Sequence, residues 1–416
     1  MKKDYRFKAA LRALGPGLMY AGAAVGVSHL VQSTRAGAEY GYSLIWVIVF
    51  INFIKFPFFE YGPRYAAATG KNLVDGYANL SKTAFYIFAG ITVATMFTVL
   101  AAITLVTAGL IIQITDVPLI AKYKTSILLS ATFLFLALST YKTIEKPIKW
   151  VIIILSVTTL VAAAATFNAN SLTFANFTAF DFTNKTDIFF LVALIGWMPA
   201  PIDIAVWHSV WGQEKNKNTN KRTAVKNASA DFTIGYWGTT FLAVCFLVLG
   251  AGVLSGENEL PDDAVGFTST LISLYTQTLG DWAFPVIAVA ALAAMLSTTL
   301  TVADGFTRVM VPVTQKLIPK RNLKPKKIYI LWLLALCAGA WYILNHYQTG
   351  MRNLIDFITT VSFVTAPILA LFNFLVITSR EVPVSSRPGK IMRSFSLFGI
   401  AFLTAFALYF LYIRFL

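Results

Sequence analysis

Long apolar runs recur along the whole chain and are separated by short polar segments. A run of about 20 apolar residues is long enough to cross a membrane as a helix. On this basis the pattern predicts eleven membrane-spanning helices. Their ranges are 14–38, 42–68, 84–114, 126–139, 148–167, 188–211, 233–254, 284–313, 328–345, 354–379 and 394–415.

Two of these helices are interrupted near their middles. The first is broken at 25–29, Val-Gly-Val-Ser-His, and the sixth at 197–203, Trp-Met-Pro-Ala-Pro-Ile-Asp. A break in mid-membrane leaves backbone polar groups unpaired, which costs several kcal/mol unless the segment lines a cavity. Because membrane transporters place their substrate at such breaks, we predict a binding site between the two.

The two interrupted helices are separated by five spans, which indicates an internal repeat. An odd number of helices per repeat makes the second repeat inverted relative to the first. We therefore predict an all-α polytopic membrane protein with a five-plus-five inverted repeat and an additional eleventh helix. The predicted units are 1–167 for the first repeat, 168–187 for an external loop, 188–379 for the second repeat, and 380–416 for a cytoplasmic loop with helix eleven.

Composition supports a membrane protein and excludes an ordinary soluble domain. Hydrophobic residues make up 57% of the chain and charged residues only 13%, about half the usual charged fraction. The net charge is +15, but the Lys and Arg residues alternate between loops and form no single patch for nucleic acid. This bias predicts a multi-pass protein of the inner (plasma) membrane with a cytoplasmic N-terminus and an external C-terminus. The two cysteines lie in apolar helices, so no disulfide framework is expected.

Several motifs resemble the Nramp family of secondary transporters. They are Gly15-Pro16-Gly17, the segments 36–38 (Ala-Gly-Ala) and 41–46 (Gly-Tyr-Ser-Leu-Ile-Trp), Met198-Pro199, His208-Ser209, and the hydroxyl-rich segment 297–301. The resemblance covers essentially the whole topology and implies a LeuT-like fold with broken helices 1 and 6. It also implies transport by alternating access. The chain carries none of the common intramembrane protease motifs, so an enzyme is not expected.

The resemblance fails where metal-transporting members of the family bind their metal. Their first break reads Asp-Pro-Gly-Asn, and alignment through residues 36–38 places Gly26-Val27-Ser28-His29 on those positions. In the sixth helix, alignment through His208-Ser209 places Pro201 at the family's methionine and Asp203 at its histidine. Alignment through Met198-Pro199 would keep the methionine but needs about three inserted residues, so we favour the first alignment, because a membrane helix accommodates substitutions more easily than insertions. The transition-metal ligands that the resemblance implies are therefore lost.

The residues that remain near the breaks suit a small anion. Gly26 removes a repelling carboxylate, and half-helix N-termini offer N–H groups and a positive dipole end. Ser28 and His29 can donate hydrogen bonds, and Gln32 or Arg35 lies one turn on, although Arg35 is also typical of a solvated helix end. We predict a small planar oxyanion, bicarbonate first, as substrate. The expected substrate-binding residues are Gly26, Val27, Ser28, His29, Pro199, Ala200 and Asp203.

Sodium is the expected coupling ion, because the resemblance to LeuT-like transporters implies a site between first-helix carbonyls and helix-eight hydroxyls. Oxygen ligation suits such a hard cation, although hydroxyls in membrane helices also bond to their own i−4 carbonyl. Asp203, His208 and Glu60 are alternative proton carriers, and Glu60 could equally pair with Lys55 or Arg64. The expected coupling residues, for sodium or a proton, are Ala24, Val27, Ser297, Thr298, Thr301 and Asp203.

The alternative prediction is proton-coupled transport of a divalent metal, manganese or magnesium. His29, Met198 and Asp203 would then be the metal ligands. His29 could instead be structural and donate to a carbonyl across the break. Apart from sodium we expect no cofactor, and the expected partners are a small inorganic ion and the lipid bilayer, with no nucleic acid and no obligate protein partner.

Overall fold

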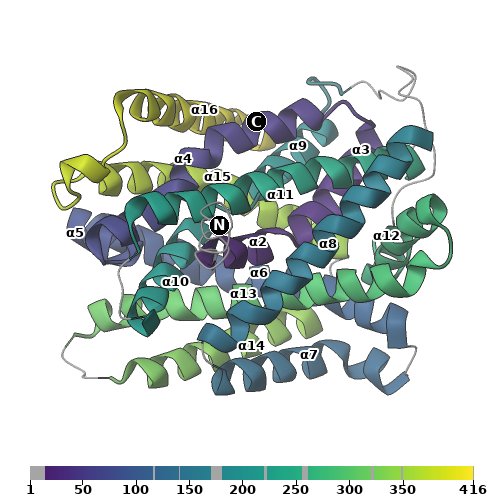
Figure 1. Cartoon of the computed structure of the whole chain (residues 1–416), viewed down its shortest axis with the longest axis horizontal. Coiled ribbons are helices and arrows are strands. Elements are labelled where there is room, and N and C mark those ends of the chain that lie inside the picture. Colours follow the sequence, from purple (N-terminus) through teal and green to yellow (C-terminus); the bar gives the residue numbers. More distant parts are fainter. Residues whose placement is uncertain are drawn as a thin grey trace, which may run out of the picture.

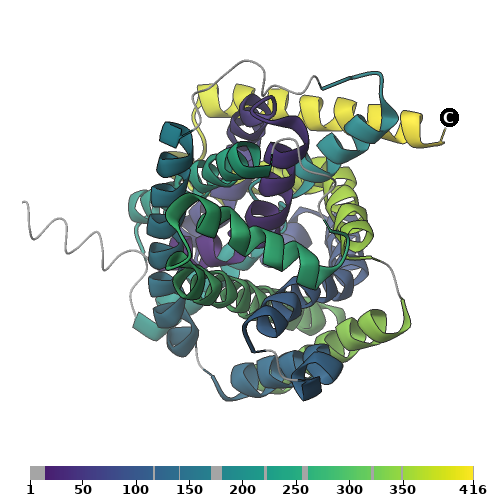
Figure 2. The same ribbon diagram turned by 90° about the vertical axis from the view of Figure 1, so that its right-hand side faces the viewer.

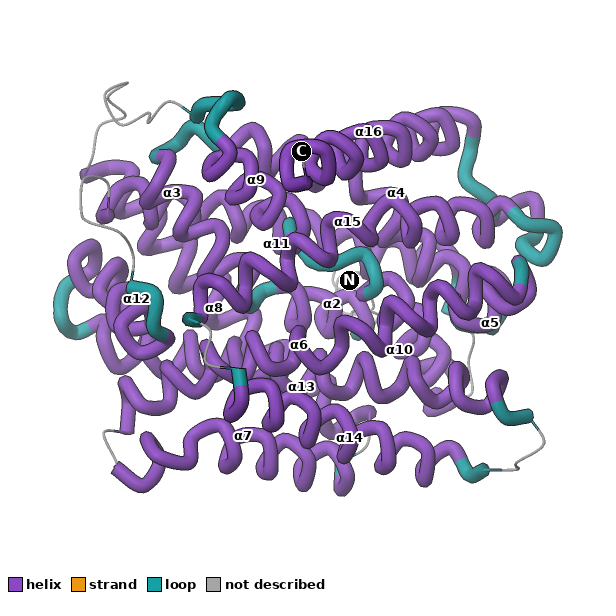
Figure 3. The backbone as a smooth tube through the Cα atoms, turned by 180° about the vertical axis from the view of Figure 1, so that it is seen from behind, coloured by secondary structure: helices purple, strands orange, loops and turns teal. Residues whose placement is uncertain are grey.

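A computed structural model of the chain describes residues 15–115, 118–139, 141–169, 180–219, 223–254, 261–319, 323–347 and 350–415. Over these ranges the chain forms helices and no strand (Figures 1 and 3). In chain order they are α2 (Pro16–Ala24), η1 (Ser28–Ser33), α3 (Thr34–Tyr40), α4 (Ile45–Thr69), α5 (Leu73–Leu80), α6 (Lys82–Thr115), α7 (Pro118–Leu138), α8 (Tyr141–Ala169), α9 (Lys185–Trp197), α10 (Ile204–Thr219), α11 (Val225–Leu254), α12 (Ala264–Leu279), α13 (Ala283–Leu317), α14 (Pro325–His346), α15 (Met351–Thr378), η3 (Val384–Ser386) and α16 (Lys390–Phe415).

All eleven predicted spans coincide with helices of the structure. Within the described ranges, seven helices are long and apolar enough to cross a membrane, namely α4, α6, α11, α13, α14, α15 and α16. The segments Tyr123–Leu138 of α7 and Trp150–Thr166 of α8 are shorter apolar helices. The first and sixth predicted spans are the interrupted units α2–η1–α3 and α9–α10. The all-helical, multi-span class is thereby confirmed, whereas the division into repeats stays a prediction.

Two short helices, α5 and α12, were not predicted. A capping box opens α5, in which Asn72 and Asp75 each accept a hydrogen bond from the other's backbone N–H. Helix α12 begins at Asp263, whose carboxylate accepts from two backbone N–H groups, and ends at Gly280 with a φ of 94°. These are ordinary start and stop signals, but both helices are too short to span a membrane. They lie at opposite ends of the bundle (Figure 1).

The interrupted helices form the centre of the molecule. Every residue of α2 except Leu18 is buried, and the views along two perpendicular directions show α2 enclosed by other helices (Figures 1 and 2). Helix α9 packs closely on α15 at Gly196, where an added Cβ would lie 2.0 Å from the carbonyl oxygen of Thr359. Such backbone contact requires glycine, and it fixes the end of α9 at the second break.

Candidate functional site

The two breaks meet at a small cavity in the middle of the bundle. The first break contributes Val27 and Ser28, and the second contributes Ala200 and Pro201. The complete lining is Ala23, Ala24, Val27, Ser28, Val99, Ile103, Trp197, Ala200, Pro201, Ile204, Trp207, Thr298 and Val302. Its volume is about 20 Å³, which is room for about one water molecule. The two breaks therefore lie together, as the sequence predicts, and the cavity between them is small.

Ser28 joins the two breaks. Its Oγ lies 3.1 Å from the carbonyl oxygen of Pro199 in the second break and 2.6 Å from that of Ala24 in the first. The same oxygen lies 2.7 Å from Nδ1 of His29. Three of the seven expected substrate-binding residues line the cavity, namely Val27, Ser28 and Ala200. Pro199 does not line it, but its carbonyl accepts a hydrogen bond from Ser28, which does.

His29 is turned toward α11 and is absent from the cavity lining. Its Nε2 lies 2.9 Å from the carbonyl oxygen of Thr239. Because a carbonyl oxygen only accepts hydrogen bonds, Nε2 carries the proton and donates it. The imidazole is fully buried, and its hydrogen bond joins the first break to α11. This is a structural role for His29, the alternative that stood beside substrate or metal binding in the sequence analysis.

Gly26 makes the closest contact of the first break with α13. An added Cβ there would lie 2.6 Å from Cγ2 and 2.7 Å from Oγ1 of Thr298. Any larger residue would have to displace this side chain, so the position needs glycine whatever the substrate. Packing against Thr298 therefore also explains why glycine stands at position 26. This reason is separate from the predicted one, that a carboxylate there would repel an anion.

The hydroxyl of Thr298 lies within a group of oxygen atoms from both helices. It is 2.9 Å from the carbonyl oxygen of Gly22, 3.2 Å from that of Val25 and 3.1 Å from that of Ala294. The neighbouring Oγ of Ser297 is buried and has no hydrogen-bond partner within the described residues. We call the four oxygens of Thr298, Gly22, Val25 and Ala294 the oxygen cluster, and Ser297 precedes Thr298 in α13.

The other expected coupling residues contribute differently. The carbonyl of Ala24 accepts from the Ser28 hydroxyl and from the backbone N–H of Gly26. The Thr301 hydroxyl donates within its own helix, to the carbonyls of Ser297 at 2.8 Å and Thr298 at 3.1 Å. The first-helix carbonyls at the Thr298 hydroxyl are thus those of Gly22 and Val25, one turn apart.

Asp203 and Met198 lie in the second break without lining the cavity. Asp203 immediately precedes α10, and its Oδ1 is buried with no hydrogen-bond partner among the residues that the structure describes. Met198 is fully buried, next to a cis peptide bond with Pro199. The described residues contain no group of three or more His, Cys, Asp or Glu side chains able to hold a metal ion. The side chains in the alternative metal set, including His29, thus all lie outside the cavity lining.

Lys55 is a site residue that sequence reasoning missed. Its side chain is fully buried in α4, and its Nζ lies 2.5 Å from the carbonyl oxygen of Ile195 and 3.0 Å from that of Gly196, at the end of α9. Glu60 pairs with Arg64 at 2.8 Å. The available signal was a lysine in the middle of an apolar span with no acid three or four positions away.

An ion-pair network joins the first interrupted unit to α15 on one side of the cavity. Arg35 donates to Asp356 at 2.8 Å and to Glu39 at 3.4 Å. Gln32 also donates to Asp356, at 3.1 Å. Arg35 is only 5% exposed, so it is a buried partner of two acids and not a solvated helix end.

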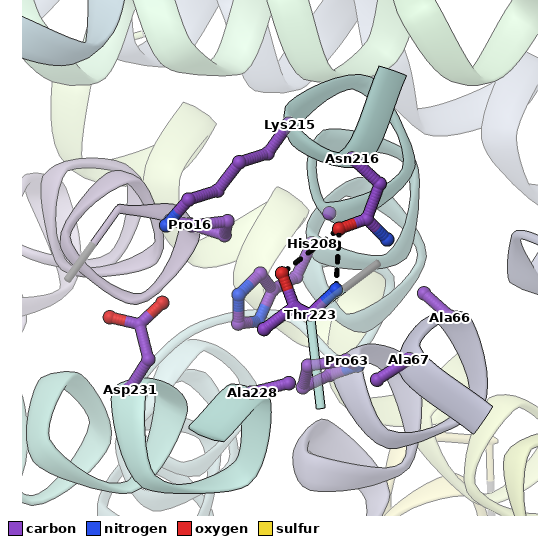
Figure 4. Close-up of a pocket in the computed structure, with 11 residues that line it drawn as sticks. Pro16, Pro63, Ala66, Ala67, His208, Lys215, Asn216, Thr223, Ala228 and Asp231 are labelled. Carbon is purple, nitrogen blue, oxygen red and sulfur yellow. Dashed lines mark hydrogen bonds between the residues drawn. The ribbon is translucent and has the colours of Figure 1, made fainter. Parts of the chain in front are cut away.

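A second cavity, of about 30 Å³, lies at the N-terminal end of α2 (Figure 4). Asp231 of α11 accepts hydrogen bonds there from the backbone N–H groups of Gly15 at 3.2 Å and Gly17 at 3.0 Å. Figure 4 shows the His208 imidazole in the middle of this lining, and its Nδ1 has no hydrogen-bond partner within the described part of the chain. His208 therefore lines this second cavity and is absent from the lining of the one between the breaks.

Comparison with known proteins gives a family match over nearly the whole chain. The family model described as Nramp, natural resistance-associated macrophage protein-like, matches residues 17–413. A Pasteurella multocida protein described as uncharacterised is 32% identical over 403 residues, which cover 96% of this chain and 92% of that protein.

Similar solved structures share the fold at low sequence identity. A mutant of the manganese transporter of Eremococcus coleocola has a TM-score of 0.72 at 15% identity, covering 97% of this chain and 86% of that one. The structure of MhsT in complex with L-phenylalanine has a TM-score of 0.68 at 14% identity, covering 96% and 97%. These likenesses confirm the predicted LeuT-like architecture. Because the family model matches residues 17–413, the chain belongs to the Nramp family and is a membrane transporter rather than an enzyme.

Proposed function

We propose that this Nramp-family transporter carries a small inorganic anion, bicarbonate first, and couples its uptake to sodium. The observation that carries the proposal is the chemistry of the cavity between the breaks. Its lining side chains are aliphatic or aromatic except for the hydroxyls of Ser28 and Thr298. A dehydrated divalent metal needs carboxylate, imidazole, thiolate or thioether ligands, and none of these side chains lines the cavity. Hydroxyl and backbone N–H donors suit an oxyanion.

The oxygen cluster supports sodium as the coupling ion. It combines the carbonyls of Gly22, Val25 and Ala294 with the hydroxyl of Thr298. The buried hydroxyl of Ser297, which has no hydrogen-bond partner within the described residues, would be a further ligand after a rotation of its side chain. Neutral oxygen ligands suit a hard monovalent cation, since no carboxylate is needed to balance a second charge. A cation there would lie between the first break and α13 and would hold them together. Sodium binding would thus act on the helix that also carries the substrate contacts.

Proton-coupled transport of manganese or magnesium is the second candidate. It is favoured by Asp203, whose buried carboxylate oxygen has no hydrogen-bond partner within the described residues. An isolated buried carboxylate is costly and is relieved by a proton or a cation. The fold-level likeness to a manganese transporter points the same way.

The expected placement in the cell belongs to the same proposal. The alternation of basic loops supports a plasma-membrane protein with a cytoplasmic N-terminus and an external C-terminus. With this orientation, the ion-pair network of Arg35 and Asp356 would lie on the external side and the second cavity on the cytoplasmic side.

Purified protein in liposomes tests the two candidates side by side. The liposomes contain a metal-quenched dye and a pH dye, and receive manganese, or bicarbonate with and without an inward sodium gradient. Bicarbonate that enters combines with an internal proton to give water and carbon dioxide, and the carbon dioxide leaves, so bicarbonate uptake raises the internal pH. Protein-free liposomes measure the opposing entry of carbon dioxide.

The expected result is a sodium-dependent internal alkalinisation with no manganese quenching above the protein-free control. Quenching by manganese without alkalinisation would replace the anion proposal by the metal one. Silence of both dyes would refute bicarbonate and manganese alike as substrates.

A further inference from the structure

Lys55 places an amino group inside the membrane domain, beside the second break. Its side chain is fully buried, and its amino group donates to two carbonyls in the last turn of α9, those of Ile195 and Gly196. The next residue along the chain, Trp197, lines the cavity between the breaks. Lys55 is therefore hydrogen-bonded to the end of α9, the segment whose next residue, Trp197, lines the cavity.

The charge of Lys55 is not cancelled by an acid. Among the described residues no carboxylate lies within 4.0 Å of its Nζ. By contrast, the buried Arg35 is paired with Asp356, Arg64 with Glu60, and Arg308 with Asp304. Lys55 has only neutral carbonyl partners.

The carbonyl end of a half-helix is normally a place for cations. Unpaired carbonyls and the negative end of the helix dipole attract them, and transporters use such ends to coordinate sodium or protons. In this chain the ammonium of Lys55 already occupies that end of α9. A second cation approaching the break would meet a like charge, which is felt strongly where the dielectric constant is low.

We propose that Lys55 carries a proton and is the specificity-determining residue of the cavity, a built-in cation that excludes metal ions from the second break and stabilises a transported anion. This inference rests on the proposed anion transport and names the residue that sets its charge preference. Lys55 acts through its field and through the position of α9, because it is not among the residues lining the cavity.

The experiment measures the apparent KM for bicarbonate in the liposome assay for the wild type and four variants. Lys55→Gln removes the charge but keeps a hydrogen-bond donor, and Lys55→Arg keeps the charge. Asn52→Asp leaves Lys55 in place and adds an acid three positions earlier in α4. It also removes the hydrogen bond that the Asn52 amide donates to the carbonyl of Ile48. Lys71→Gln is the matched control, because it removes the same charge from an exposed ion pair with Glu381.

We expect Lys55→Gln and Asn52→Asp to raise the KM at least tenfold, Lys55→Arg to stay within threefold, and Lys71→Gln to match the wild type. The thermal unfolding of each variant in detergent shows whether it is folded. A merely structural role would make Lys55→Arg and Lys55→Gln equally defective, and that pattern would overturn the inference. An unchanged KM in Lys55→Gln would do the same.

The wild-type arm separates this inference from the proposed function. If the wild type takes up bicarbonate and the variants do not differ from it, anion transport stands and the role of Lys55 is refuted. If the wild type takes up manganese and no anion, the function and the inference fall together. Asn52→Asp covers the case in which Lys55→Gln does not fold, since it neutralises the charge without emptying the position.

Discussion

An added Cβ at Gly26 would lie 2.7 Å from the hydroxyl oxygen of Thr298, so these two residues fix how closely the first break approaches α13. The contact places the Thr298 hydroxyl beside the carbonyls of Gly22 and Val25. The same contact between Gly26 and Thr298 consequently sets both the packing of the first break on α13 and the position of the hydroxyl in the oxygen cluster.

Gly26→Ala is expected to damage both properties together. The methyl group must push Thr298 away, and overpacking of this kind costs about 1–3 kcal/mol. We predict a lower Tm in detergent and at least a tenfold loss of sodium-dependent uptake. Adding Thr298→Ala should restore the Tm by making room, without restoring the sodium dependence. Recovery of both in the double variant would contradict a role for the hydroxyl.

The oxygen cluster predicts which hydroxyls sodium needs. Thr298→Val removes an oxygen of the cluster, Ser297→Ala removes the hydroxyl proposed as a further ligand, and each should raise the sodium concentration for half-maximal uptake at least fivefold. Thr301→Val is the matched control, because the Thr301 hydroxyl bonds within its own helix. Initial rates of bicarbonate uptake across a series of sodium gradients give the measurement. Equal effects at all three positions would argue against this site.

Asp203 separates the two candidate functions. Asp203→Asn keeps the size of the side chain and removes its charge. We expect it to leave sodium-dependent bicarbonate uptake within about threefold of the wild type, because the carboxylate does not line the cavity. If the metal candidate is right, the same variant should abolish manganese quenching. The two-dye liposome assay reports both readouts in one sample.

The ion pair of Arg35 and Asp356 predicts how access to the cavity is controlled. Asp356→Asn removes one of the two acids that hold Arg35, which should loosen η1 and α3 from α15. A reporter cysteine at Ala200, in a chain with Cys245 and Cys337 replaced by alanine, should then react at least fivefold faster with a polar thiol reagent in detergent. Arg414→Gln, at the far end of α16, is the control. An unchanged labelling rate would show that the pair does not close the cavity.

Glu381 predicts a pH-dependent contribution to stability outside the membrane spans. Partial burial alone would raise the pKa of Glu381, but hydrogen bonds from Asn79, Tyr65 and Lys71 lower it below its ordinary value. A lowered pKa stabilises the folded state at pH values above the unfolded pKa, and this stabilisation is lost as the pH falls through the folded pKa. Glu381→Gln should therefore lower the Tm at pH 7, with the difference from the wild type disappearing in strongly acidic buffer. A difference that persists in acid would rule out the ionised carboxylate as its source.

Much of the fold was predictable because membrane spans leave a long and unambiguous hydrophobic signal. Gly, Pro and Ser in mid-membrane identified both breaks, and the structure brings Val27, Ser28 and Ala200 of those breaks to one cavity. Helices α5 and α12 were missed because only runs of spanning length were considered, although Asn72 and Asp263 carry their capping signals.

The directions of the side chains were not predictable from spacing. His29 sits in the break by sequence, yet it binds Thr239 on α11, a partner 210 positions away. From the sequence we expect Ala24 and Val27 among the coupling residues, whereas the carbonyls at the Thr298 hydroxyl are those of Gly22 and Val25. This difference depends on how the chain turns after α2. The carbonyl partners of Lys55 lie 140 and 141 positions along the chain, so no local pattern names them.

The hydroxyl of Ser28 has one hydrogen and three acceptors around it, the carbonyls of Ala24 and Pro199 and the ring of His29. A single hydrogen can be given to only one of them at a time. When it points to Pro199, the two interrupted helices are bonded to each other, and when it points to Ala24, the first helix is bonded only to itself. An anion that accepts this hydrogen takes it from all three, so its arrival would remove the bond between Ser28 and Pro199 that joins the two breaks at the moment the site is filled.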